Sequence, residues 1–393
     1  VSSNMKQASG LVEIVDRKSG LCRMPATEKN VKAKKVSSMY ILIPQWFSSK
    51  YYEVSEIKDG YIYFLAPGVD DSSINAYANP NCDYRYAGKI PRYALVNNPA
   101  SKGFRVKRNG KICSPSGTRV IRCDAGCFLS LRGCAVKSVE ISGLRFLGSG
   151  GDAPLLDFYR NVVSDKIGIS GCIFDGIKGD VARVVATDSF HFEDNEIRNS
   201  HTNGIVSNPE ASGTVVKGNH FYNIGTDVGQ YFGVICRGSN FTISDNYFED
   251  FVYSAIGVGL WYKSTEAQVC SGIIENNECC LSSSFRNGVY RNLMDSGAIY
   301  AWTANKDVVI RNNYVHDIDG PWENRGIFCD DGTVNVKIVG NKVERISNSY
   351  CIDLRRVLSV ETAPGSMVRK VNVGNEMKDN IVDGKVRFEG RDK

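Results

Sequence analysis

The chain has 393 residues, of which 42% are hydrophobic and 23% are charged, and this balance excludes a disordered or fibrous protein. Lysine and arginine number 48 against 43 acidic residues, with both signs scattered along the sequence, so the net charge of +5 does not indicate a nucleic-acid partner. The sequence contains no run of about 18 apolar residues, and we therefore expect no membrane-spanning helix.

The first 109 residues are rich in predicted strands, such as 38–43 and 61–65, separated by loops that contain Pro, Tyr and Asn. They lack the repeated phrase described below. Residues 1–109 are therefore interpreted either as elaborated first coils or as a cap over the open end of a solenoid. The sequence starts at Val1 without a charged and then apolar leader, so we expect a trimmed chain that has lost any export signal.

A short phrase recurs from about residue 110 onward: an apolar residue, two variable residues, Asn, a variable residue and a second apolar residue. Degenerate copies surround Leu144 and Cys172, and a slipped copy surrounds Asn375. Successive anchors are 23 to 36 residues apart. The clear copies have their anchors at Asn195, Asn219, Asn246, Asn277, Asn313 and Asn341.

Each period carries short runs of Val, Ile, Phe, Tyr and Thr between Gly, Asn and Asp, which is typical of strands joined by turns. Equivalent strands of successive periods would stack in parallel about 4.8 Å apart. We therefore predict an all-β fold, a single-stranded right-handed parallel β-helix over residues 110–393, with the hand assigned by analogy. The Asn anchors are interpreted as structural corners, because Asn tolerates left-handed backbone angles and its amide can form a ladder between coils.

The sequence has 13 cysteines but only four histidines. No CxxC pair lies near a histidine, and the adjacent Cys279 and Cys280 cannot easily serve one tetrahedral site. We therefore expect no metal and no organic cofactor. Most cysteines are interpreted as small buried hydrophobic residues, with one or two disulfides as the alternative.

The densest cluster of carboxylates, aromatic rings and arginines lies within the longest period and the one after it, over residues 277–332. Function in a solenoid concentrates in its longest insertions. Counting back from the anchors places Asp295 opposite Glu323, and Trp302 opposite Asp330, in adjacent coils. Two carboxylates at such range allow one to stay protonated as a general acid while the other is ionised, as glycoside hydrolysis requires.

Three phrases in this region carry a family resemblance. Residues 295–302 look like D-G-G-A-I-Y-x-W, residues 310–317 like I-x-x-N-x-I-H-D, and residues 326–332 like G-I-Y-x-D-D-G. Over about residues 110–350 the chain resembles the β-helix glycoside hydrolases of family 141, the α-fucosidase and xylanase group, and related β-helix β-xylosidases. The resemblance implies a carbohydrate-active enzyme with paired acidic catalysts, matched by Asp295 and by Asp330 and Asp331. Ser296 replaces the second Gly of the first phrase, and the usual opening phrase, G-x-D-x-x-G-x-x-x-x-P-F, is absent.

The candidate catalytic residues are Asp295, Asp330, Asp331 and Glu323. Stacking favours Asp295 with Glu323, whereas the phrases favour Asp295 with Asp330 or Asp331, which flat strands would separate by roughly 20 Å. The alternative for each Asp is an ordinary turn before Gly. Candidate sugar contacts are aromatic platforms and polar anchors, namely Trp302, Tyr300, Trp322, Arg325, His316 and Arg355.

The predicted function is hydrolysis of a glycosidic bond in a plant or microbial glycan by a secreted or periplasmic monomer. We expect a carbohydrate as the partner and no nucleic acid. Two alternatives remain open. One is a β-helix polysaccharide lyase or epimerase acting on uronates, which would need a Lys or Arg base and often Ca²⁺. The other is a non-catalytic carbohydrate-binding solenoid.

Overall fold

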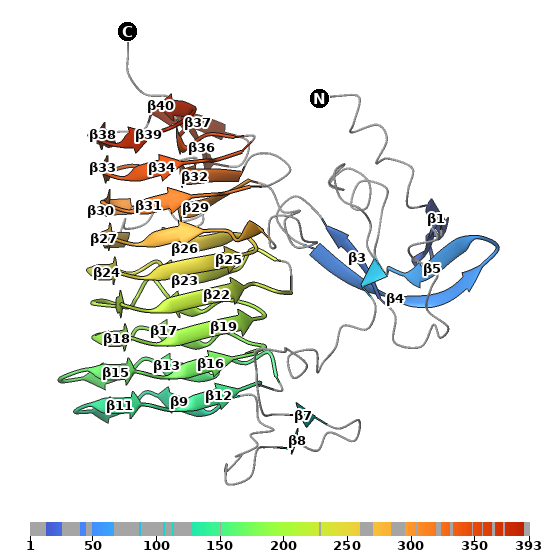
Figure 1. Cartoon of the computed structure of the whole chain (residues 1–393), viewed down its shortest axis with the longest axis horizontal. Coiled ribbons are helices and arrows are strands. Elements are labelled where there is room, and N and C mark those ends of the chain that lie inside the picture. Colours follow the sequence, from blue (N-terminus) through green and yellow to red (C-terminus); the bar gives the residue numbers. More distant parts are fainter. Residues whose placement is uncertain are drawn as a thin grey trace. The chain divides into compact units, whose positions relative to one another are not determined.

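The computed structural model of the chain describes residues 13–25, 40–44, 49–66, 86–87, 105–106, 112–113, 127–149, 151–227, 229–259, 270–283, 295–302, 305–319, 324–330, 333–347, 349–355, 357–363, 366–371 and 374–388. The chain divides into two compact units, Val1–Arg122 and Cys123–Lys393 (Figure 1). The regular elements of the described residues are β-strands. Within this part of the chain, no helix is long and apolar enough to cross a membrane.

The first unit contains a six-stranded antiparallel sheet with Cys22, Ile62 and Phe64 in its core. The strands of this sheet pair antiparallel, whereas coils of a parallel solenoid pair in parallel. The unit ends at Arg122. The strand order is β1 (Glu13–Asp16), β2 (Leu21–Pro25), β5 (Tyr61–Leu65), β4 (Ser49–Lys58), β3 (Tyr40–Pro44) and β6 (Tyr86–Ala87), and a separate antiparallel pair joins β7 (Arg105–Val106) to β8 (Ile112–Cys113).

The second unit is built from three long parallel sheets, which we call sheets I, II and III. Sheet I consists of β11 (Val139–Ser142), β15 (Ile167–Ser170), β18 (Phe190–Glu193), β21 (Val215–Lys217), β24 (Phe241–Ser244), β27 (Cys270–Glu275), β30 (Asn305–Arg311), β33 (Val336–Val339) and β38 (Glu376–Lys378). Sheet II consists of β12 (Arg145–Leu147), β16 (Ile173–Asp175), β19 (Glu196–Ser200), β22 (His220–Ile224), β25 (Tyr247–Phe251), β28 (Glu278–Cys280), β31 (Tyr314–His316), β34 (Lys342–Glu344) and β39 (Ile381–Val382).

Sheet III has ten strands and carries the candidate site. It consists of β9 (Leu129–Arg132), β13 (Leu156–Tyr159), β17 (Ala182–Val185), β20 (Ile205–Ser207), β23 (Phe232–Cys236), β26 (Ser254–Val258), β29 (Ser296–Ala301), β32 (Asn324–Cys329), β35 (Ile352–Leu354) and β40 (Val386–Phe388). Two smaller pairings complete the unit: β10 (Ala135–Val136) with β14 (Val162–Val163) in parallel, and β36 (Val357–Ala363) with β37 (Ser366–Val371) as an antiparallel hairpin.

Each coil contributes one strand to each of the three sheets, and the coils stack on one another along the axis of the second unit (Figure 1). Alternate residues of each strand point inward and form columns of like side chains. Phe146 stacks on Phe174 with ring centroids 4.8 Å apart, and Phe221 stacks on Phe248 at 4.5 Å. The predicted all-β parallel β-helix is confirmed, and its core is a stack of aromatic and aliphatic layers.

The cysteines behave as small core residues rather than as cross-links. Eight cysteines whose side chains are described are buried and free of disulfides, among them Cys172, Cys236 and Cys279. Cys279, for example, is fully buried between Phe248 and Val315 of neighbouring coils. Burial raises the pKa of its thiol well above the usual range, so it stays a neutral hydrophobic group.

Buried asparagines form a ladder at the corner between sheets I and II. The main-chain N–H and the Nδ2 of Asn219 both donate to Oδ1 of Asn246, each at 2.9 Å, and Nδ2 also donates to the carbonyl of Phe192. Because every buried amide is paired with its neighbours above and below, the ladder sets the spacing of the coils. The same bonds connect Asn195, Asn219, Asn246, Asn277, Asn313 and Asn341 in order.

The ladder ends at Asn380 and not at Asn375. The main-chain N–H and Nδ2 of Asn341 donate to Oδ1 of Asn380 at 2.9 Å, whereas Asn375 accepts from the first residue of β33. Residues 377–382 match the repeated phrase without any slip, so the sequence did contain the correct last anchor.

The left-handed backbone at this corner belongs to the residue before each anchor. Asp194, Gly218 and Asp245 have φ values of 54°, 66° and 57°, and none of the anchor asparagines has a positive φ. The expectation that the anchor Asn itself adopts a left-handed backbone is therefore wrong, whereas the expected amide ladder is present. The preceding Gly, Asp or Asn makes the turn.

Sheet III differs from the other two sheets in its burial. Strands of sheets I and II alternate between buried and half-buried residues, as in β18 and β31. Strands β23, β26, β29 and β32 are buried along their whole length. The outward side chains of this part of sheet III are therefore packed away from solvent, including the charged side chain of Arg325.

Candidate active site

Asp295 lies immediately before β29 and has a left-handed backbone with φ of 56°. A short polar side chain tolerates this conformation better than most residues. The carbonyl of Asp295 accepts a hydrogen bond from the hydroxyl of Tyr253 at 2.8 Å. Its carboxylate Oδ1 accepts from Nη1 of Arg325 at 3.1 Å and from Nη2 of Arg355 at 3.3 Å. The backbone turn thus aims the carboxylate at two guanidinium groups.

Asp330 follows β32, and two donors hold its carboxylate. Nη1 of Arg355 donates to Oδ1 at 2.9 Å, and the hydroxyl of Tyr300 donates to Oδ2 at 2.6 Å. The main chain fixes the residue as well, because its N–H donates to the carbonyl of Ala301 in the neighbouring coil at 2.8 Å. Asp295 and Asp330 keep 19% and 16% of their side chains exposed, so both remain accessible at the edge of the buried face.

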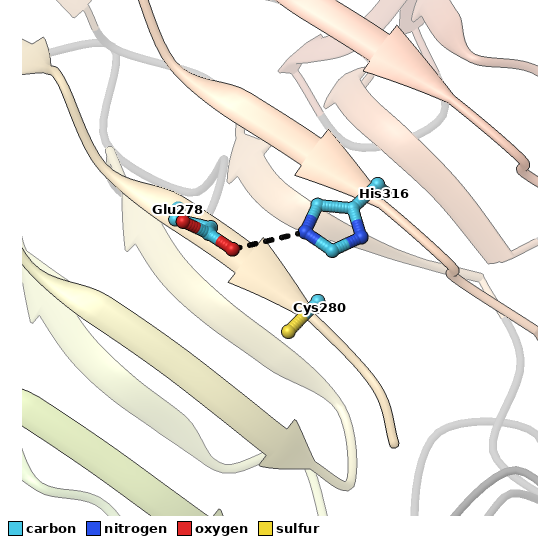
Figure 2. A group of neighbouring side chains, drawn as sticks. All are labelled: Glu278, Cys280 and His316. Carbon is cyan, nitrogen blue, oxygen red and sulfur yellow. Dashed lines mark hydrogen bonds and ion pairs between the residues drawn. The ribbon is translucent and has the colours of Figure 1, made fainter. Parts of the chain in front are cut away.

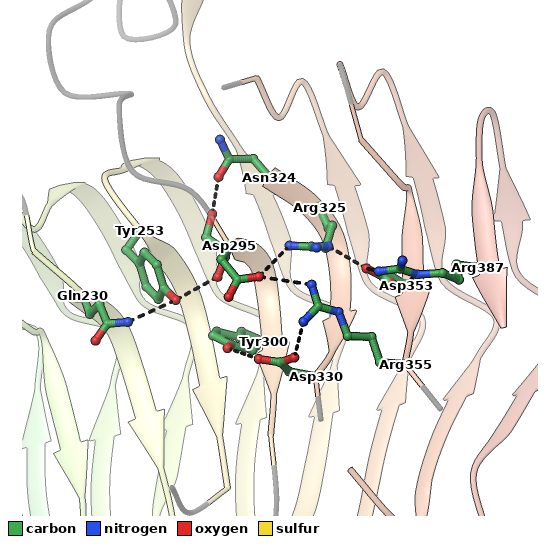
Figure 3. A network of polar contacts seen from close by, with 11 residues as sticks. Gln230, Tyr253, Asp295, Tyr300, Asn324, Arg325, Asp330, Asp353, Arg355 and Arg387 are labelled. Atoms are coloured by element: carbon green, nitrogen blue, oxygen red, sulfur yellow. Dashed lines mark hydrogen bonds and ion pairs between the residues drawn. The ribbon is translucent and has the colours of Figure 1, made fainter. Parts of the chain in front are cut away.

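Arg355 connects the two carboxylates (Figure 3). Its two terminal nitrogens contact one carboxylate each, which keeps the nearest oxygens of Asp295 and Asp330 at most about 9 Å apart, below the upper limit of about 9.5 Å for the carboxyl groups of glycosidases. The separation of roughly 20 Å expected for flat strands is therefore wrong. The chain between the two residues does not run as a flat, straight strand, so counting strand residues overestimates the distance.

A buried ion network supports this arrangement from behind. Arg325 is 1% exposed, and its Nε donates to Oδ2 of the fully buried Asp353 at 2.6 Å. Arg387 donates to the other oxygen of Asp353, also at 2.6 Å. Three arginines thus face three aspartates in one connected set (Figure 3). Burial of these charges is tolerable because each has oppositely charged, hydrogen-bonded partners.

Aromatic rings pack against the charged network. Tyr300 stacks on Phe328 with centroids 4.8 Å apart, and the guanidinium groups of Arg325 and Arg355 lie 3.9 Å and 4.8 Å from the Phe328 ring. Burial, together with the nearby carboxylates, raises the pKa of Tyr300 and of Tyr253 far above the usual range. Both hydroxyls therefore stay neutral donors at every physiological pH.

The structure places the other predicted residues in different surroundings. Trp302 and Tyr300 are 7% and 4% exposed and pack against each other with centroids 4.9 Å apart, so little ring surface is open. The indole Nε1 of Trp302 is buried and has no hydrogen-bond partner within the described ranges. Arg325 is buried as a support for Asp295. His316 lies in β31 of sheet II, so it belongs to a different sheet from the Asp295–Asp330 pair.

Three predicted residues, Glu323, Asp331 and Trp322, lie outside the described residues.

Sequence reasoning missed four members of the network, which are Tyr253, Asp353, Arg387 and Gln230. Gln230 donates to the Tyr253 hydroxyl at 3.5 Å. Asp353 is the fourth residue of the strand phrase at residues 350–354, which recurs in other coils. Stacking that strand on β32 would have placed Asp353 beside Phe328, as observed. Tyr253 and Arg387 carried no such signal.

Comparison with known proteins agrees with the fold. Residues 183–356 match the model of the right handed beta helix region, a family defined by its fold. The second unit is therefore a right-handed parallel β-helix, as the sequence predicted. No curated protein matches this chain. One matching solved structure is described as "Glycoside hydrolase"; it has 12% identity and a TM-score of 0.48, and the alignment covers 95% of this chain and 74% of the other.

Proposed function

We propose that this protein is a glycoside hydrolase and that Asp295 and Asp330 are its catalytic pair. The observation that carries the proposal is the Arg355 bridge, which holds two partly exposed carboxylates close enough to act on one glycosidic bond. The three sequence phrases that resemble β-helix glycosidases include both aspartates.

The two carboxylates have different partners, and we assign their roles from this difference. Asp295 faces two guanidinium groups, Arg325 and Arg355, and we assign it as the nucleophile or base. Asp330 faces one guanidinium group and the neutral hydroxyl of Tyr300, and we assign it as the acid that protonates the leaving oxygen. Asp331 and Glu323 remain the alternative acids.

A glycan-panel hydrolysis assay tests the proposal. Asp295→Asn and Asp330→Asn should each lower turnover by about 10²–10⁴-fold, since removing a general acid or base has this effect. Asp245→Asn is the matched control, because Asp245 has nearly the same backbone angle, φ 57°, at a corner on another sheet. Full activity of Asp295→Asn on a glycan that the wild type cleaves would remove the proposal.

The same assay separates the alternative functions. A uronate lyase or epimerase would give, respectively, an unsaturated product that absorbs ultraviolet light or a changed sugar configuration without chain cleavage by water. A binding protein would retain glycan affinity in both Asn variants and turn over nothing. We also propose that the enzyme acts outside the cytoplasm, as expected for an enzyme of polymeric glycans. Fractionation of cells that express the full-length protein tests this location.

A further inference from the structure

A second polar cluster lies on the outward face of sheet II, away from the proposed catalytic pair. Glu278 and Cys280 are two residues apart in β28, so their side chains point to the same face, and the core residue Cys279 points to the other. His316 of β31 pairs directly with Cys280 in the next coil. The alternation of the strand therefore separates the adjacent cysteines and brings a carboxylate, a thiol and an imidazole together (Figure 2).

The spacing of the three donor atoms suits a small cation. Nε2 of His316 lies 3.1 Å from Oε1 of Glu278, and the ligand atoms of Glu278, Cys280 and His316 all lie within 4.8 Å of one another. Ligands at about 2.0–2.3 Å from a tetrahedral ion are about 3.3–3.8 Å apart. The imidazole–carboxylate edge is already close to this length, and the thiol needs a shift of about 1 Å or less.

The surroundings orient the donors as in a metal site. Nδ1 of His316 contacts Oδ2 of Asp317 at 2.7 Å, and Arg345 holds that carboxylate with bonds of 2.9 Å and 3.1 Å. With Nδ1 directed at Asp317, Nε2 is the imidazole nitrogen that faces Glu278. A carboxylate on the far nitrogen is the usual partner of a metal-binding histidine. The ring of Tyr314 stacks on the imidazole at 4.2 Å and fixes its plane.

The charge and burial of the surrounding residues also favour a bound cation. Glu249 pairs with Cys280 in the preceding coil, so two carboxylates, Glu249 and Glu278, flank the thiol. Cys280 is 6% exposed, and the side chains of His316 and Glu278 are 14% and 46% exposed, which places two donors under cover and leaves one side open to water. A water molecule on the open side would be the fourth ligand.

We propose that Glu278, Cys280 and His316 bind one Zn²⁺ ion, with Asp317 as the residue that positions the imidazole. Sulfur and nitrogen donors select zinc over Ca²⁺ or Mg²⁺, which prefer oxygen alone. The site links β28 to β31 and thereby two successive coils. It revises the expectation from the sequence that the protein uses no metal, and it stands independently of the proposed hydrolase activity.

Metal titration of the full chain tests the proposal. Protein freed of metal by a chelator is titrated with Co²⁺, and we expect one ion per chain, the absorption band of a thiolate bound to cobalt, and loss of the band when Zn²⁺ is added. Cys280→Ser should abolish the band, and Asp317→Asn should weaken Zn²⁺ binding by about 10–100-fold. Cys134→Ser, which removes a partly exposed thiol in an early coil, is the matched control and should keep the band.

Two results would overturn the proposal. One is the absence of a thiolate band in the wild type at saturating Co²⁺. The other is a band that persists in Cys280→Ser, because cobalt would then be bound by another cysteine. His316→Gln, with circular dichroism to verify folding, gives an independent readout, and its Zn²⁺ affinity should fall by at least about tenfold.

Discussion

The two arginines that contact Asp295 should contribute to stability very differently. Arg325 is 1% exposed and pairs with the fully buried Asp353, and breaking a buried pair costs about 3–5 kcal/mol. Asp353 keeps Arg387 as a partner, so we expect Arg325→Met to cost about 3 kcal/mol, near the lower limit. Arg355 is 23% exposed and pairs with partly exposed carboxylates, so Arg355→Met should cost about 1 kcal/mol.

Equilibrium unfolding in urea measures the contrast. With an m-value of about 2 kcal/mol/M, the midpoint should fall by about 1.5 M for Arg325→Met and by about 0.5 M for Arg355→Met. At temperatures where both variants are folded, Arg355→Met should lose more activity than Arg325→Met. Loss of the bridging donor in Arg355→Met should lower turnover by about 10²–10³-fold, as for other preorganised donors.

Equal destabilisation by the two substitutions would refute the reasoning, since it would mean that the buried Arg325–Asp353 pair is not held as described. Wild-type turnover by Arg355→Met would refute the role of the bridge, even if the stabilities follow the expected order.

Three further predictions concern the ladder, the strand that carries Arg325 and the buried phenols. Asn246→Ala removes an amide that both donates and accepts in the ladder, and calorimetry or urea unfolding should show a loss of about 2–4 kcal/mol; a loss below about 1 kcal/mol would mean that the ladder is dispensable. A Cβ at Gly326 would lie 2.5 Å from a main-chain oxygen of the next coil, so Gly326→Ala should cost about 1–3 kcal/mol and its thermal midpoint should fall, whereas an unchanged midpoint would show that the coils can move apart there. Tyr253 and Tyr300 have raised pKa values in the folded state, so the unfolded chain loses their protons first, and stability should fall as pH rises above about 10, by up to about 1.4 kcal/mol per pH unit for each group. Tyr253→Phe and Tyr300→Phe should each reduce that slope in unfolding experiments across alkaline pH, and identical slopes in the variants and the wild type would contradict the assignment.

Much of the fold could be predicted because a solenoid repeats its local rules. The asparagine phrase marks one corner per coil, and its spacing gives the register, so that the offset between β29 and β32 was predicted correctly. The last corner was misplaced at Asn375, because the intact asparagine phrase around Asn380 lies in a charged segment and was overlooked. The N-terminal strands lack the phrase, and their antiparallel pairing could not be distinguished from early coils by composition.

The candidate sites show where this reasoning stops. Asp295 and Asp330 were named as candidates from the sequence, but the predicted distance between them was too long because it assumed flat strands. The sequence argument considered only whether Cys279 and Cys280 could share one site, whereas the neighbours of the Cys280 thiol are Glu278 on the same face of β28 and His316 in the next coil.

The sequence by itself determined the winding of the chain, because periodic apolar residues and corner amides act over a few residues and recur in every coil. The tertiary structure alone decided which charges meet. Ion pairs such as Arg325–Asp353 and Arg355–Asp295 join residues that are 28 and 60 positions apart, and their contacts depend on side-chain reach across stacked strands. Electrostatic interactions follow distance in space and not separation in the sequence, so the chemistry of this protein became visible only when the coils were stacked.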